Sequence, residues 1–179
     1  MIRLGHKDQR FFIFDYETTG TDTDKCRILE IGIIVCNENF ELMETFESLV
    51  CHDAGDMQLN WNHDELSAYK IHGIKPLDLS HGMTLQEIRS TIENLAMKHT
   101  KNTVKPIIVS DNIQFEWALT ARILPPIRGY FHYCGWDTSL FLDATGVGDP
   151  PTPPHRALKD CGLLHAAILK ALDRTRNLR

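Results

Sequence analysis

The stretch Phe-Phe-Ile-Phe-Asp-Tyr-Glu-Thr-Thr-Gly at residues 11–20 decides the fold, because it joins an apolar strand to paired acidic residues. The apolar residues predict a buried strand at 10–15, and the last three residues predict a turn. Side chains two positions apart on a strand share one face, so Asp15 and Glu17 should project together. Close carboxylates repel unless a cation neutralises them, and Mg²⁺ or Mn²⁺ prefers such oxygen ligands. Taken alone, the same residues also fit an acidic turn.

Length and composition are those of an ordinary globular protein. A chain of 179 residues predicts one domain over 1–179, and shares of 42% hydrophobic and 24% charged residues are typical. No apolar run approaches the ~20 residues that cross a membrane, and the N-terminus is too polar for a signal peptide. We therefore expect a cytoplasmic protein without membrane contact, whose five cysteines are free thiols.

Apolar periodicity and turn residues predict a mixed α/β arrangement. Two strands, at 27–37 and 40–50, follow the first through short links, which implies an antiparallel meander. Further strands are expected at 106–109 and 130–136, and helices at 64–69, from Thr84, around Phe115 to Ile123, and from about Arg156. This order predicts an α/β fold with a mixed five-stranded sheet flanked by helices.

Two later segments place polar residues at helix starts. Asn112 and Glu116 are four residues apart and would share a helix face. His155 follows a proline-rich stretch at 149–154, and Asp160 lies just over a turn further on. An imidazole beside a carboxylate is a suitable arrangement for a general base. Each segment alone also fits a plain helix start, in which the acidic residue compensates the helix dipole.

Five motifs occur together: Phe-Asp-Tyr-Glu-Thr-Thr-Gly (14–20), His-Gly-Ile (72–74), Asp-Asn-Ile-Gln-Phe-Glu (111–116), Trp-Asp-Thr (136–138) and His-Arg-Ala-Leu-Lys-Asp (155–160). In this order they resemble the DEDDh branch of the DEDD superfamily of 3′–5′ exonucleases, which includes proofreading subunits, oligoribonuclease and ribonuclease T. The resemblance covers about 10–172 and implies a ribonuclease-H-like fold. It also implies release of nucleoside monophosphates from the 3′ end of single-stranded DNA or RNA, by a monomer or homodimer.

The resemblance also implies residue roles. Two Mg²⁺ or Mn²⁺ ions would be held by Asp15, Glu17, Glu116 and Asp160, and His155 would activate the attacking water. The family pattern Asn-x-x-Phe-Asp ends here in Glu116, one methylene longer, so Glu116 is the expected ligand and Asp111 the alternative. Substrate contacts are expected at Tyr16, Thr18, Thr19, Gly20, His72, Asn112 and Phe115. The altered motif leaves a non-catalytic nucleic-acid-binding domain as the alternative function.

Overall fold

The computed structural model describes residues 7–52, 63–148 and 155–177, and for 63–67 and 177 the main chain only. Its centre is a five-stranded sheet in the order β3-β2-β1-β4-β5. The strands are β1 (Phe11–Thr18), β2 (Ile28–Cys36), β3 (Leu42–Leu49), β4 (Ile107–Ser110) and β5 (Trp136–Asp137). The first three pair antiparallel, whereas β4 pairs parallel with β1 and β5 parallel with β4. The predicted meander and mixed sheet are confirmed.

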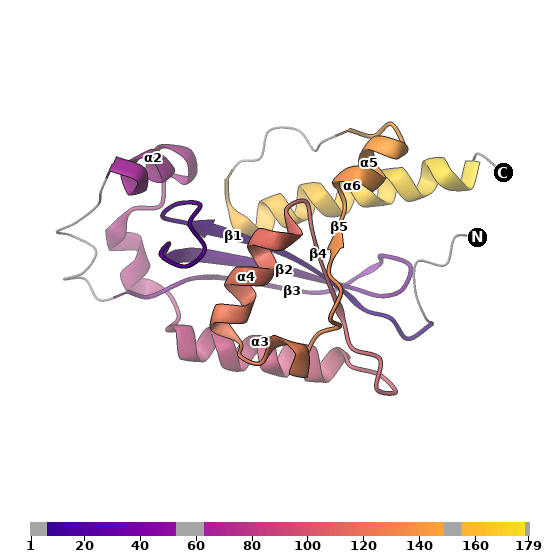
Figure 1. Cartoon of the computed structure of the whole chain (residues 1–179), viewed down its shortest axis with the longest axis horizontal. Helices are drawn as coiled ribbons and strands as arrows, with labels where there is room; N and C mark the ends of the chain where they lie inside the picture. The colour runs from indigo at the N-terminus through magenta and orange to yellow at the C-terminus, as the bar shows by residue number, and fades with distance from the viewer. Residues whose placement is uncertain (1–6, 53–62, 149–154, 178–179) are drawn as a thin grey trace.

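Helices cover both faces of the sheet, with α6 (Ala157–Asn177) on one side and α3 (Leu85–His99) on the other (Figure 1). The remaining helices are α2 (His63–His72), α4 (Ile113–Ile123) and α5 (Ser139–Ala144), with 3₁₀ turns at Pro76–His81 and Ile127–Gly129. Within the described residues, no helix combines the length and apolar character needed to cross a bilayer. All five cysteines are free thiols.

Strand β1 alternates its side chains between two apolar cores, which is why its first four residues are all apolar. Phe12 and Phe14 pack in the core beneath α3 and α4, while Phe11 and Ile13 pack in the core beneath α6. By the same alternation, the odd-numbered Asp15 lies on the α6 face. The sheet thus turns its acidic pair toward the last helix of the chain.

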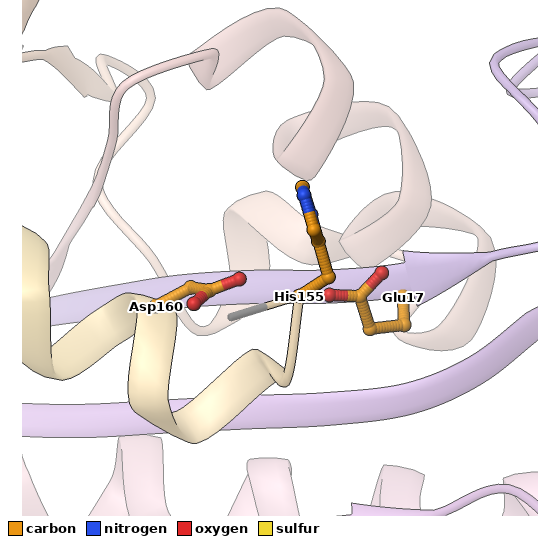
Figure 2. Close-up of side chains that lie close together, drawn as sticks. All are labelled: Glu17, His155 and Asp160. Atoms are coloured by element: carbon orange, nitrogen blue, oxygen red, sulfur yellow. The ribbon is translucent and has the colours of Figure 1, made fainter. Parts of the chain in front are cut away.

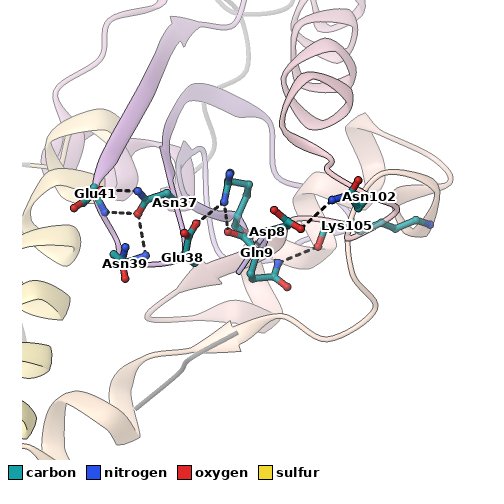
Figure 3. Close-up of polar contacts among 9 residues, drawn as sticks. Asp8, Gln9, Asn37, Glu38, Asn39, Glu41, Asn102 and Lys105 are labelled. Carbon is teal, nitrogen blue, oxygen red and sulfur yellow. Dashed lines mark hydrogen bonds and ion pairs between the residues drawn. The ribbon is translucent and has the colours of Figure 1, made fainter. Parts of the chain in front are cut away.

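The link between β2 and β3 is the turn that its polar residues predict. Asn37 Oδ1 accepts hydrogen bonds from the main-chain N–H of Asn39 at 2.9 Å and of Glu41 at 3.0 Å (Figure 3). Phe40 takes a positive φ of 62° there and buries its ring against Phe11. The turn therefore fixes the register of β2 and β3 by local hydrogen bonds and by a core contact.

The structure differs from the sequence-based prediction at three elements. Strand β1 continues to Thr18, so Glu17 lies within the strand. The fifth strand is Trp136–Asp137 rather than 130–136, because the N–H groups of Tyr130 and Phe131 bond back to Ile127 in a turn. Helix α5 was not predicted. The proline-rich stretch 149–154 lies outside the described residues.

Gly32 on β2 lets the start of α6 approach the sheet closely. A Cβ at this position would overlap main-chain atoms of Ala157 and Leu158. We expect Gly32→Ala to lower the free energy of unfolding by about 1–3 kcal/mol, since helix and sheet must separate. Urea unfolding measures this loss. Gly162→Ala, which adds a methyl to α6 where no atom lies within 4 Å, is the control and should not destabilise.

Candidate active site

Three predicted site residues meet where α6 begins. The ligand-type atoms of Glu17, His155 and Asp160 all lie within 4.8 Å of one another. Figure 2 shows Glu17 coming from β1, His155 from the segment just before α6, and Asp160 from the first turn of that helix. The close approach of α6 to β2 at Gly32 brings these residues together, although they are far apart in the sequence.

A cavity of about 290 Å³ opens at this place. Its polar wall consists of Asp15, Glu17, Asp111, His155 and Asp160. Its apolar wall includes Leu163 and Leu164 of α6. Four carboxylates and one imidazole thus face a space that can hold a small ligand, with an apolar surface on one side.

Burial and mutual repulsion raise the pKa values of the acidic residues. Burial raises the pKa of Glu17 to about 8, and the charge of Asp160 adds to the effect. Burial also raises the pKa of Asp15 well above its ordinary value, followed by the charges of Glu17, Glu116 and Asp160. Burial raises the pKa of Asp160 as well. Carboxylates gathered in this way favour either protons or a cation.

These pKa values predict how stability depends on pH. The pKa of Glu17 rises from 4.5 to about 8 and that of Glu116 from 4.5 to about 7, so folding favours their protonated forms. Their stabilising contribution is complete below about pH 4.5 and is lost as the pH rises to about 8, which costs a few kcal/mol. We expect the Tm of the metal-free protein to fall as the pH rises from about 4.5 to about 8. Calorimetry should show a smaller fall in Glu17→Gln.

Glu116 and Asp111 occupy different environments. Glu116, in the first turn of α4, is 4% exposed, and its Oε2 accepts a hydrogen bond of 2.9 Å from Ser110 Oγ. Burial raises the pKa of Glu116 to about 7, against the opposing effect of this hydrogen bond. Asp111 is exposed and lies in the cavity wall. Among the charges that raise the pKa of Asp15, Glu116 acts more strongly than Asp111.

The loop after β1 is held by local hydrogen bonds. Thr18 Oγ1 donates to the Gly20 carbonyl at 2.7 Å. Thr19 is buried, its Oγ1 accepts from the Arg27 N–H at 2.9 Å, and its own N–H donates to the Arg27 carbonyl. The side-chain oxygens of both threonines are therefore engaged within the protein, and the loop has one defined shape beside the acidic residues.

The other residues predicted to contact substrate lie in three places. Asn112 and Phe115 line a shallow depression together with Thr21 and Gln114. Tyr16 is among the residues that line the cavity, but its hydroxyl is buried and bonds to Thr120 Oγ1 at 2.8 Å, so its ring packs in the core beneath α4.

His72 ends α2 and is 7% exposed. Its Nδ1 accepts from the Ile74 N–H at 2.9 Å, while its Nε2 is buried without a partner among the described residues. Burial lowers the pKa of this imidazole. A neutral ring with an accepting Nδ1 carries its proton on Nε2, so His72 holds a free donor near the start of α6.

The family of the chain follows from comparison with known proteins. The family RNase_T, described as an exonuclease, matches residues 12–167. The chain belongs to this exonuclease family. Curated relatives agree: a probable oligoribonuclease of Dictyostelium discoideum is 23% identical over 88% of this chain and 85% of its own. An oligoribonuclease of Chromobacterium violaceum is 26% identical over 72% of this chain and 71% of its own length.

Solved structures show the same fold. This exonuclease superposes on E. coli exonuclease I in complex with a dT13 oligonucleotide with a TM-score of 0.71 at 16% identity, over 95% of this chain. The match spans 42% of the exonuclease I chain. The nuclease domain of 3′hExo, a DEDDh family member bound to rAMP, superposes with a TM-score of 0.62 at 15% identity, over 92% of each chain. The predicted ribonuclease-H-like fold and the membership of an exonuclease family are confirmed.

Sequence reasoning missed Glu30, which lies beside the site. Glu30 on β2 is 1% exposed, and its carboxylate accepts from Arg156 Nε at 3.0 Å and from the Ala157 N–H at 3.0 Å. A charged residue inside the apolar run of residues 28–36 was the available signal, since a buried charge requires a partner. The identity of that partner, 126 residues away, was not readable from spacing.

Proposed function

We propose that this exonuclease uses two divalent cations, Mg²⁺ or Mn²⁺, to hydrolyse single-stranded nucleic acid from the 3′ end, releasing nucleoside monophosphates. The proposal rests on the convergence of Glu17, His155 and Asp160 within 4.8 Å beside Asp15. Short RNA is the first substrate to test, because the curated relatives are named oligoribonucleases. We also propose that residues 1–179 act as one domain.

The described residues fit a divalent cation. Asp160 Oδ1 is buried and has no hydrogen-bond partner among them, so an acceptor oxygen stands free beside the cavity. Burial raises the pKa values of Asp15, Glu17 and Asp160, and the charges of neighbouring carboxylates add to the effect, so a bound cation would favour their charged forms. Carboxylate oxygens are the ligands that Mg²⁺ and Mn²⁺ select. When bound, paired ions stabilise the charge on the entering and departing oxygens of a phosphodiester.

Asp15, Glu17 and Asp160 would hold the cations, with Glu116 as the fourth carboxylate. Glu116 is preferred to Asp111 because it is a buried carboxylate whose charge acts on Asp15, whereas Asp111 is exposed at the cavity wall. Its longer side chain is steadied by the Ser110 hydroxyl at 2.9 Å. Titration with Mn²⁺ tests this choice: Glu116→Gln should weaken binding more than Asp111→Asn, and the reverse order would assign the role to Asp111.

His155 would act as the general base. Its imidazole stands over the Glu17 and Asp160 carboxylates, where it can take a proton from the attacking water. The loop at Thr18 to Gly20 and the depression at Asn112 and Phe115 would receive the terminal nucleotide, with the Phe115 ring available for stacking. His72 Nε2 would offer a hydrogen bond to the same nucleotide.

An exonuclease assay tests the proposal as a whole. Single-stranded RNA and DNA of one sequence, labelled at the 5′ end, are incubated with the protein and Mg²⁺ or Mn²⁺. We expect a ladder that shortens from the 3′ end and disappears with a chelator. Binding of the oligonucleotide without cleavage would support the alternative, a nucleic-acid-binding domain without catalysis.

A further inference from the structure

We infer that Glu30 is a positioning residue of the metal site: it holds the Arg156 guanidinium away from Glu17 and fixes the start of α6. This inference rests on the proposed metal-binding function. It assigns a role to a residue that neither lines the cavity nor reaches a substrate.

The Glu30–Arg156 pair is a two-point contact. Arg156 Nε lies 3.0 and 3.1 Å from the two carboxylate oxygens, and Nη2 lies 2.5 Å from Oε1. Glu30 is 1% exposed, whereas the Arg156 side chain is 42% exposed. The buried carboxylate therefore determines where the more accessible guanidinium lies, and the planar fork of arginine fixes its orientation.

Glu30 and Glu17 compete for the guanidinium of Arg156. They are direct partners across the β1–β2 ladder, so both carboxylates lie on the α6 face. The charge of Arg156 acts on Glu17 and lowers its pKa, while the charge of Glu30 raises it. Besides Glu30, the charges of Glu47 and Glu17 act on the Arg156 guanidinium. Without the Glu30 charge, the guanidinium can turn to either of them, and a pairing with Glu17 would occupy a carboxylate needed for the metal.

Glu30 also caps α6. Its Oε2 accepts from the Ala157 N–H at 3.0 Å, which satisfies a main-chain donor of the first turn and places a negative charge at the positive end of the helix dipole. The adjacent His155 has a φ of 51°, a left-handed conformation that costs free energy in a residue other than glycine. Contacts of one carboxylate to residues 156 and 157 restrain the chain next to His155 and Asp160.

Binding of Mn²⁺, followed by electron paramagnetic resonance, tests the inference. Glu30→Gln keeps the size of the side chain and an acceptor for Ala157 but removes its charge. We expect the affinity for Mn²⁺ to fall about tenfold. Adding Arg156→Gln to this variant removes the freed guanidinium and should restore the affinity to within about threefold of wild type. An effect of Glu30 through its contact with Ala157 alone predicts no such restoration, because both variants lack the Glu30 charge.

A matched control is available at the far end of β1. Glu38, labelled in Figure 3, forms an ion pair of 2.7 Å with the buried Arg10. Glu38→Gln should leave Mn²⁺ affinity unchanged. Thermal unfolding verifies that each variant is folded. If Glu30→Gln does not fold, Glu30→Gln/Arg156→Gln is compared with Glu30→Gln/Arg156→Lys, in which the retained cation should weaken binding.

The outcomes distinguish a failure of the proposed metal site from a failure of the role assigned to Glu30. Wild-type protein that binds no Mn²⁺ overturns the metal site and this inference with it. Wild-type binding with an unchanged affinity in Glu30→Gln, or a double variant as weak as the single one, overturns the role of Glu30 and leaves the metal site standing. A weakened single variant with a restored double variant supports the inference.

Discussion

We expect Asp15→Asn to lower the rate of 3′-end hydrolysis by about a thousandfold or more, while the protein remains folded. Asparagine has the size of aspartate but lacks the negative charge that would hold a cation. Loss of metal stabilisation worth several kcal/mol corresponds to this factor, because each 1.36 kcal/mol changes a rate about tenfold. Shortening of a 5′-labelled oligonucleotide in Mg²⁺ measures the effect.

Stability should change in the opposite direction. Burial and the neighbouring carboxylates raise the pKa of Asp15, so its charge opposes folding when no cation is bound. Metal-free Asp15→Asn should therefore unfold at a temperature equal to or above that of wild type near pH 8. Glu38→Gln is a control for the rate measurement. Full activity in Asp15→Asn would contradict the metal-site proposal.

We expect His155→Asn to lower kcat by about 10²–10⁴-fold, the range for loss of a general base. Asparagine is chosen because it tolerates the left-handed backbone that His155 adopts, with φ of 51°. Single-turnover cleavage measures the rate, and titration with Mn²⁺ measures metal affinity separately. A general base predicts a lost rate with affinity kept within a few-fold, together with partial rescue by added imidazole.

A loss of metal affinity with turnover kept would assign a different role to His155. His155 lies within 4.8 Å of Glu17 and Asp160, so its nitrogen is also close enough to serve as a ligand. Loss of Mn²⁺ affinity by His155→Asn, with turnover preserved at saturating metal, would make the imidazole a ligand. Leu163→Ala, in the apolar wall of the same cavity, controls for nonspecific disturbance.

Elements with a strong apolar period could be predicted from the sequence, and elements set by tertiary hydrogen bonds could not. Strand β1 and helix α6 follow from their patterns, because each buries a complete face. Strand β5 has two residues and forms where Val109 and Ser110 of β4 provide partners. Its location is set by β4, so local propensity misplaced it to 130–136.

The same limit applies to the candidate site. Asp15, Glu17, His155 and Asp160 were named from motifs, and the structure places all of them around one cavity. The surroundings of Glu116 were not predictable, because the hydrogen bond from Ser110 depends on how β4 meets α4. Spacing indicates which residue types are present, whereas the burial that decides their charge state arises from packing.

The docking of α6 on β2 has a consequence during synthesis of the protein. Glu17 is made early and Asp160 late, and they meet only when the last helix closes over Gly32. A nascent chain that has formed β1 to β4 therefore contains Asp15 and Glu17 but still lacks Asp160. Under the proposed function, an unfinished polypeptide would not hydrolyse nucleic acid near the ribosome, because the site would be complete only after the final segment emerges.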